Sequence, residues 1–288
     1  MKERKIKKII EGSWVVEGAG VKLKRIFGFG DTSLTDPFLL LDNFGSKTPA
    51  DYIAGFPWHP HRGIETITYM IEGVVAHGDS LGNSGEIKSG QVQWMTAGSG
   101  IVHQEMPKAY EGNMRGFQLW ANLPKKEKMS RPRYRDIQAE DIPEFKGEGF
   151  SIKLICGDYG GVSGPAQDII IKPWFFDVKA GPGAEFTLEV RPEDNVLCCV
   201  FEGKGWFDKM KTQEVGPGQL AVLEEGGSAL SCSAGAEGLR FMLMAGKPLK
   251  EPVAWQGPIV MNTASELRTA FEEYRKGTFI KPYSGVKG

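Results

Sequence analysis

Three of the four histidines in the chain occur in two short patterns that could bind a metal ion. His59 and His61 flank a single proline, and His103 and Glu105 flank a single glutamine. Because alternate residues of a strand point to the same side, each pair would present its two donors together. Imidazole nitrogen and carboxylate oxygen suit a divalent first-row metal, and histidines with one carboxylate are typical of non-haem iron sites. These four residues are therefore candidate metal ligands.

A second carboxylate is an alternative to Glu105 in this site. If the strand that carries His59 and His61 continues without a break, Glu65 points to the same side as both histidines. The spacing alone leaves the choice between Glu65 and Glu105 open. Three histidines and one carboxylate would leave roughly two positions on an octahedral ion for water, dioxygen or a substrate.

The same alternation predicts which neighbouring side chains line the site. On the side of the histidines we expect Ile67 and Tyr69 to line an apolar cavity, with residues 56–58 at its rim. The side chains expected to face away are Arg62, Thr66 and Thr68. His77 and Asp79 belong to a separate hairpin and are expected at the surface or behind the ligands.

The elements that must position these residues are mostly β-strands. The 288 residues include 38 glycines and 17 prolines, which divide short runs of β-branched and aromatic residues. This pattern predicts a β-sandwich or a β-barrel. The strand candidates are residues 64–71, 92–95, 119–122, 169–171, 186–190 and 239–244.

One β unit is predicted to occur twice. Glu72, followed by glycine, precedes a turn at Gly90, and a strand starts at the glutamine after it. Glu202 and Gly218 repeat this order with the same following residues. The recurrence indicates a duplicated β domain. The charged stretch 124–149 between the two copies contains several prolines and glycines and is predicted to connect two domains.

The end of the chain has a different pattern. Thr263 and Glu266 form a capping box, which predicts that a helix starts between them, and Gly277 is placed to end it. Apolar residues then recur at helical spacing on one face, namely Leu267, Ala270, Phe271 and Tyr274. This face predicts a short helix that docks on a barrel as a structural strap.

Composition argues against several classes of protein. Lys and Arg total 35 against 36 Asp and Glu, a net charge of −1, whereas direct nucleic-acid binding usually shows a basic excess. The sequence has no apolar run near the roughly 20 residues that cross a bilayer, and its charged start does not resemble a secretory signal. The four cysteines lack metal-binding spacing and are expected to be buried free thiols of a cytoplasmic protein.

Two long motifs resemble the signature stretches of the pirin family. Residues 55–66 read GFPWHPHRGIET, and residues 93–106 read QWMTAGSGIVHQEM. Residues 79–85 are similar to the loop between these stretches. Residues 245–252 and 257–262 resemble the C-terminal segment of the family. The resemblance covers most of the chain.

This resemblance implies an all-β bicupin, with two stacked cupin (jelly-roll) β-barrels and a short C-terminal helix. The expected domains are an N-terminal metal-binding barrel, residues 1–135, and a C-terminal metal-free barrel with the helical tail, residues 136–288. By analogy with the family, the metal ligands are His59, His61, His103 and Glu105, which favours Glu105 over Glu65.

The predicted repeat allows a separate comparison of the two barrels. Transferring the offsets of the four candidate ligands to the second copy gives Glu189, Arg191, Ser231 and Ser233. No histidine follows residue 103. The second barrel therefore cannot form a three-histidine site and is expected to be structural, with one metal per chain.

The resemblance implies two classes of function. The first is a flavonol (quercetin) 2,3-dioxygenase, in which one divalent metal, Fe(II) or else Mn, Ni, Co or Cu, binds the flavonol and Glu105 acts as the general base. Its partners would be a flavonol-like aromatic substrate and dioxygen. The alternative is an iron-binding, redox-responsive regulatory protein that acts through a protein partner. The family also suggests a monomer.

Overall fold

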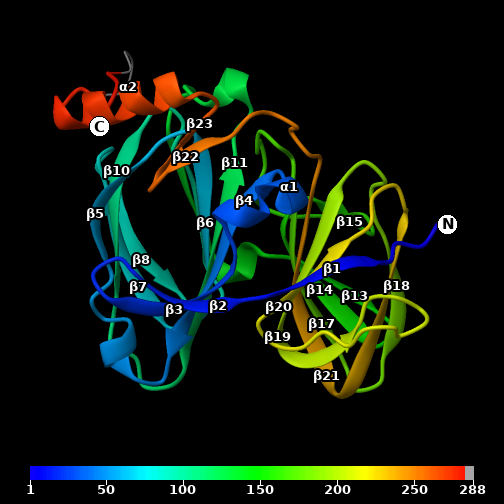
Figure 1. Cartoon of the computed structure of the whole chain (residues 1–288). Helices are drawn as coiled ribbons and strands as arrows, with labels where there is room; N and C mark the ends of the chain where they lie inside the picture. Colours follow the sequence, from blue (N-terminus) through cyan, green and yellow to red (C-terminus); the bar gives the residue numbers. More distant parts are fainter. Residues whose placement is uncertain (283–288) are drawn as a thin grey trace. The chain divides into compact units, whose positions relative to one another are not determined.

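The computed structural model describes residues 1–282 and consists mainly of β-strands (Figure 1). The chain forms two compact units, each assembled from segments that are distant in the sequence. Unit 1 comprises Met1–Ser13, Ile26–Pro37 and Glu140–Pro248, and unit 2 comprises Trp14–Arg25, Phe38–Ala139 and the chain from Leu249 onward. Within residues 1–282, no helix combines the length and the apolar character that a membrane span requires.

Unit 2 contains a seven-stranded and a four-stranded antiparallel sheet. The order of the larger sheet is β12 (Arg133–Ile137), β9 (Val92–Thr96), β6 (Ile64–Glu72), β11 (Met114–Asn122), β4 (Phe38–Ser46), β3 (Val21–Phe27) and β2 (Ser13–Glu17). The order of the smaller sheet is β5 (Phe56–His61), β10 (Ile101–Pro107), β7 (Val74–Asp79) and β8 (Ser84–Lys88). The strands predicted at 64–71, 92–95 and 119–122 are confirmed as β6, β9 and part of β11.

The chain changes from the smaller to the larger sheet immediately after His61. Arg62 and Gly63 separate β5 from β6, and Gly63 has a φ of +78°. A Cβ atom at Gly63 would lie 2.0 Å from the carbonyl oxygen of Val260, so only glycine fits this bend. Side-chain alternation therefore does not continue from β5 into β6, and the faces predicted for β6 are wrong.

The predicted repeat has a structural counterpart in the turns of the two units. Gly90 and Gly218 both have a φ of +80°. The amide of Gly90 donates to the carbonyl of Met70, two residues before Glu72, and the amide of Gly218 donates to the carbonyl of Val200, two residues before Glu202. The same hydrogen bond at matching positions shows that the turn of the predicted repeat is present in both units.

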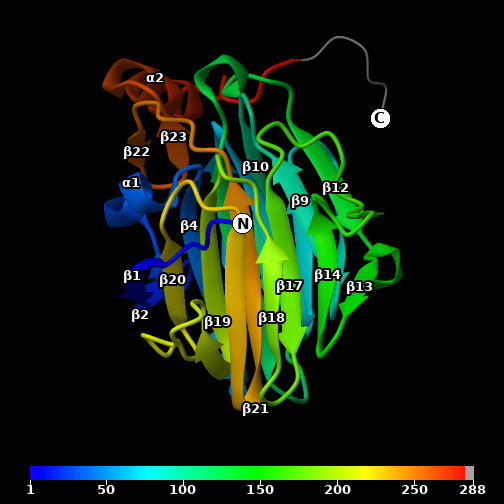
Figure 2. The same cartoon turned by 90° about the vertical axis from the view of Figure 1, so that its right-hand side faces the viewer.

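Unit 1 is organised around one antiparallel sheet. Its order is β1 (Ile6–Glu11), β20 (Gln219–Leu223), β19 (Asn195–Trp206), β21 (Ala229–Gly246), β17 (Trp174–Ala180), β14 (Phe150–Cys156) and β13 (Glu144–Gly147), with β18 (Glu185–Glu189) also paired to β21 (Figure 2). Unit 1 also contains α1 (Thr32–Thr35) and the short pair β15 (Asp158–Tyr159) and β16 (Val162–Ser163). The stretch 124–149 contributes β12 and β13 to these sheets, so it is more than a linker.

The interior of unit 1 is filled by apolar side chains. Fully buried core residues from β17, β19 and β21 include Phe176, Val178, Cys198, Val200, Phe241 and Leu243. All four cysteines of the chain are free and buried, as predicted. The strand predicted at 169–171 is wrong, because Asp168 and Lys172 adopt positive φ values of 60° and 46° and turn the chain there.

The C-terminal segment of unit 2 forms a hairpin and a helix. Strands β22 (Ala254–Gln256) and β23 (Ile259–Met261) pair, and α2 (Ala264–Arg275) follows them (Figure 1). The predicted capping box is present, since Thr263 Oγ1 accepts from the amide of Glu266 while Glu266 Oε2 accepts from that of Thr263. Ala270 of the predicted apolar face is buried against Ile259 and Met261, which confirms a docked helix.

Candidate metal centre

Pairing of β5 with β10 brings the two histidine patterns together. His103 lies directly opposite His59, and Ile101 lies opposite His61. Residues opposite one another in an antiparallel pair point to the same side of the sheet. All three imidazoles therefore project from the same face of the four-stranded sheet.

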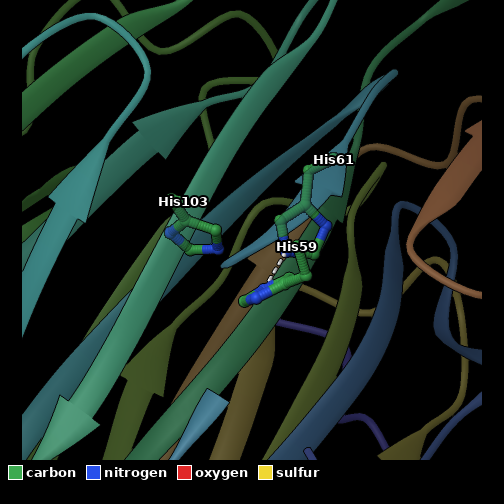
Figure 3. A group of neighbouring side chains, drawn as sticks. All are labelled: His59, His61 and His103. Carbon is green, nitrogen blue, oxygen red and sulfur yellow. Dashed lines mark hydrogen bonds between the residues drawn. The ribbon is translucent and has the colours of Figure 1, made fainter. Parts of the chain in front are cut away.

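The three imidazoles form a compact cluster (Figure 3). One ring nitrogen from each of His59, His61 and His103 lies within 4.8 Å of the others. Their ring centroids are 4.4–4.9 Å apart. His61 and His103 are each 2% exposed, whereas His59 is partly open to solvent.

Two of these rings are fixed by backbone carbonyl groups. Nδ1 of His59 lies 2.8 Å from the carbonyl oxygen of Pro57, and Nδ1 of His61 lies 3.1 Å from that of Pro258. A carbonyl oxygen only accepts hydrogen bonds, so each Nδ1 carries the proton. The Nε2 lone pairs of both rings are therefore free to bind a metal ion, the arrangement typical of metal-binding histidines.

Burial keeps these imidazoles neutral. It lowers the pKa of His59, although the bond to Pro57 opposes this effect. The pKa of His61 is held well below its ordinary value by burial and by the neighbouring His59, and that of His103 by burial and by the other histidines. Neutral imidazole is the form that binds metals.

The cluster fits a cation at its centre. Nε2 of His59 and Nε2 of His61 are 3.1 Å apart, and both are acceptors when Nδ1 carries the proton. Nitrogens bound side by side at about 2.1 Å from one ion lie roughly 3 Å apart. Nε2 of His103 is buried and has no hydrogen-bond partner among residues 1–282. A bound cation would satisfy all three nitrogens.

Glu105 lies on the same face of β10 but its carboxylate is engaged elsewhere. The hydroxyl of Thr68 lies 2.8 Å from Glu105 Oε1, and within the described chain the compact cluster contains only the histidines. Burial raises the pKa of Glu105 to about 7, and the bond to Thr68 partly opposes this shift. A cation nearby would favour the carboxylate form and lower the pKa.

Glu65 is placed away from the histidines. Its Oε1 accepts a hydrogen bond from Thr96 of the neighbouring strand β9, whereas Thr68, on the alternate face of β6, bonds Glu105. The expectation that Glu65 shares the side of His59 and His61 is therefore wrong. The bend at Gly63 is the reason.

The predicted cavity wall needs the same correction. Ile67 and Tyr69 share the face of Glu65, and Thr68, expected to face away, points toward the site. At the predicted rim, the ring centroid of Phe56 lies 6.4 Å from that of His59. Trp58 points to the opposite face of β5 and is 52% exposed.

His77 was expected at the surface or behind the ligands, and it is buried; sequence patterns did not identify Tyr134 or Trp120 as contacts of the histidines. His77 lies opposite Glu105 on β7, is 6% exposed, and contacts the hydroxyl of Tyr134 through a ring nitrogen. Trp120 packs edge-on against His61 at 5.0 Å between ring centroids. Thr68 did not stand out in the sequence, because β6 also contains Glu65, Thr66 and Glu72, and the other contacts are long-range.

The two units and the site define a class of protein. Two β units share the same turn, one has an apolar core, and the other holds three histidines on strands β5 and β10 of its four-stranded sheet. This is a two-domain cupin protein, a bicupin, with a candidate metal centre in one domain.

Comparison with known proteins identifies the family. Residues 20–121 match the family model described as Pirin, and residues 175–280 match the one described as Pirin C-terminal cupin domain. The chain belongs to the pirin family.

Several relatives extend over nearly the whole chain. A Pseudomonas aeruginosa protein named "Putative quercetin 2,3-dioxygenase" is 44% identical and covers 91% of this chain and 93% of its own length. A pirin-like protein of Caulobacter vibrioides is 40% identical over 97% of this chain and all of its own. A crystal structure of quercetin 2,3-dioxygenase from Acinetobacter baumannii superposes with a TM-score of 0.88 at 34% identity, covering 96% of this chain and 98% of the other.

Proposed function

We propose that this protein is a metal-dependent dioxygenase that cleaves flavonols of the quercetin type. The observation that carries the proposal is the cluster of three neutral imidazoles, whose Nε2 atoms converge and include one buried nitrogen without a partner. The names of the Pseudomonas and Acinetobacter relatives support the flavonol as the substrate class.

The residues proposed to hold the metal are His59, His61, His103 and Glu105. A divalent ion bound there would acidify the 3-hydroxyl group of a flavonol and provide open positions for substrate and dioxygen. Fe(II) is the proposed metal, and the donor set also accepts Mn, Ni, Co or Cu.

Glu105 is proposed to take the proton of the flavonol 3-hydroxyl group. A general base must be deprotonated to accept a proton; burial raises the pKa of Glu105 to about 7 in the metal-free chain, and a bound cation would lower it and favour the carboxylate form. Thr68 holds the carboxylate in place through its hydrogen bond, and the half-buried Phe56 beside His59 offers an aromatic surface to a planar substrate.

The test is turnover of quercetin by the reconstituted protein. The apo-protein is loaded anaerobically with Fe(II), mixed with quercetin and oxygen, and the loss of flavonol absorbance is followed. We expect the Fe(II)-loaded wild type to turn over quercetin. His61→Ala should abolish this turnover, and Ser231→Ala, in unit 1, should leave it unchanged. A filled site without turnover for any of the five metals would contradict the enzyme and favour an iron-binding regulator.

A further inference from the structure

The chain after residue 248 contacts the metal-binding strands at several points. Figure 1 shows β22, β23 and α2, in orange to red, at one end of the sheets of unit 2. The amide of Val260 donates to the carbonyl of Arg62 at 3.1 Å. Gly63 allows the close approach, since any Cβ there would overlap the carbonyl of Val260. The segment 249–282 is therefore built against the residues that directly follow His61.

This segment supplies the group that orients His61. The carbonyl of Pro258, two residues before Val260, accepts from Nδ1 of His61. The ring of Trp255 packs on Trp120 at 5.8 Å, and Trp120 packs edge-on against His61. The C-terminal segment therefore positions the His61 imidazole in two ways: directly through the Pro258 hydrogen bond, and indirectly through the packing of Trp255 on Trp120.

A buried arginine attaches the same segment at its far end. The guanidinium of Arg62, 2% exposed, donates to the carbonyl of Ser99 at 2.6 Å and to that of Phe279 at 3.0 Å. It also pairs with Glu273 of α2 at 2.7 Å and lies 4.2 Å from the ring centroid of Phe279. Arg62 therefore joins the residue next to His61 to the helix and to the chain beyond it.

A buried lysine fixes the hairpin itself. Nζ of Lys128, in a side chain 1% exposed, donates to the carbonyls of Gly63 and Val260 at 2.9 and 3.1 Å and to Asn122 Oδ1 at 2.7 Å. In its protonated form the amine has three donors, and all three are used here. Lys128 thereby holds the bend after His61 and strand β23 at a fixed separation.

We propose that the C-terminal segment is a positioning element of the metal centre: the Pro258 carbonyl sets the tautomer and orientation of His61, and Arg62 and Lys128 hold the segment in place to do so. This inference rests on the proposed metal site. Partners that orient metal-binding histidines typically contribute 10–100-fold to metal affinity.

The test measures metal binding and the tautomer of His61, without any substrate. Lys128→Met and Arg62→Gln remove the two anchors in the full-length chain. Competition of the apo-protein with a chelator for Co(II) and Fe(II) gives the affinity, and the ¹⁵N shifts of the labelled imidazoles give the tautomer. We expect about 10–100-fold weaker binding and loss of the fixed Nδ1–H form of His61.

A buried arginine in unit 1 provides the matched control. Arg4 is 1% exposed and donates to four carbonyl groups, including those of Gly227 and Arg191. Arg4→Gln removes a comparable buried anchor in unit 1, whereas the histidines belong to unit 2, so it should lower stability but change metal affinity less than about twofold. A metal affinity that falls equally in Arg4→Gln would overturn the proposal, because general destabilisation would then explain the loss.

A milder variant keeps the proposal testable if Lys128→Met or Arg62→Gln does not fold. Glu273→Gln weakens the ion pairs that Glu273 of α2 forms with Arg62 and with Lys281, each at 2.7 Å, and leaves the other contacts of Arg62 in place; Glu273 is partly exposed. It should weaken metal binding in the same direction by a smaller factor. Unchanged affinity and an unchanged His61 tautomer in the folded variants would refute the proposal. Because no flavonol is present, a lack of quercetin turnover would count only against the proposed enzyme.

Discussion

The hydroxyl of Thr68 lies 2.8 Å from Oε1 of Glu105, and this bond joins the seven-stranded sheet to the four-stranded sheet within unit 2. The same hydroxyl lies 2.7 Å from Oε1 of the Gln118 side-chain amide, a second acceptor. One hydroxyl proton cannot serve two acceptors, so when Thr68 donates to Glu105 the amide of Gln118 must turn its NH₂ group toward Thr68. Gln118 then donates to the hydroxyl of Thr68, and this hydroxyl donates to the carboxylate of Glu105.

Loss of this hydroxyl should weaken the metal site. Thr68→Val keeps the shape of the side chain but removes the donor, whereas Thr68→Ser retains it. We expect metal affinity about 10-fold lower in Thr68→Val and close to wild type in Thr68→Ser, since groups that hold a ligand contribute 10–100-fold. Chelator competition measures both. Equal affinities for the two variants would mean that Thr68 does not position Glu105.

The choice between the two carboxylates can be decided by a matched pair of substitutions. Glu105→Gln removes a negatively charged candidate metal ligand. Glu65→Gln makes the same change on the other face of β6, where Glu65 accepts from Thr96. We expect Glu105→Gln to lower kcat by about 10²–10⁴-fold, the range for loss of a general base, and to weaken metal binding. Glu65→Gln should leave both within about threefold of wild type. The reverse ranking would identify Glu65 as the functional carboxylate.

Lys128 should make stability depend on pH. Burial lowers its pKa from 10.5 to about 7, partly opposed by Glu251 and Glu266. Between about pH 7 and 10.5 the unfolded chain therefore binds more protons than the folded one, so Lys128 adds to the free energy of unfolding as pH rises. Its contribution is lost as pH falls toward 7, with a slope of at most about 1.4 kcal/mol per pH unit.

Urea unfolding of wild type and Lys128→Met from pH 7 to 10 measures this contribution. The difference in unfolding free energy between the two proteins should grow in favour of wild type as pH rises. A difference that stays constant over this range would show that Lys128 keeps an ordinary pKa in the fold.

The sequence was informative where chemistry and turns are local. The His59–His61 and His103–Glu105 patterns identified the strands that meet in the structure, and the paired turns at Gly90 and Gly218 identified the duplication. The capping box at Thr263 located the start of α2. The histidine patterns and the capping box each involve residues within a few positions of one another, and the turns involve residues of a single hairpin, so the sequence pattern is sufficient to predict them.

The sequence was misleading where geometry depends on distant contacts. Alternation through Gly63 predicted the wrong face for Glu65, because the chain moves to another sheet at that bend; Gly63 was the one local sign of it, since a glycine inside a strand pattern often marks a bend. The carbonyl that orients His61 belongs to Pro258, 197 residues away in the sequence. Spacing could not reveal such a partner, since only the folded C-terminal segment brings it to the imidazole.

The central claim is that His59, His61, His103 and Glu105 converge on one metal ion with vacant positions. A crystal structure of the protein loaded anaerobically with Fe(II), with anomalous diffraction recorded at the iron edge, tests it directly. We expect a single iron per chain. The three Nε2 atoms and a carboxylate oxygen of Glu105 should bind it at about 2.1 Å, with water in the remaining positions. An iron bound outside the three imidazoles, or bound by them with neither carboxylate oxygen of Glu105 coordinated, would contradict it.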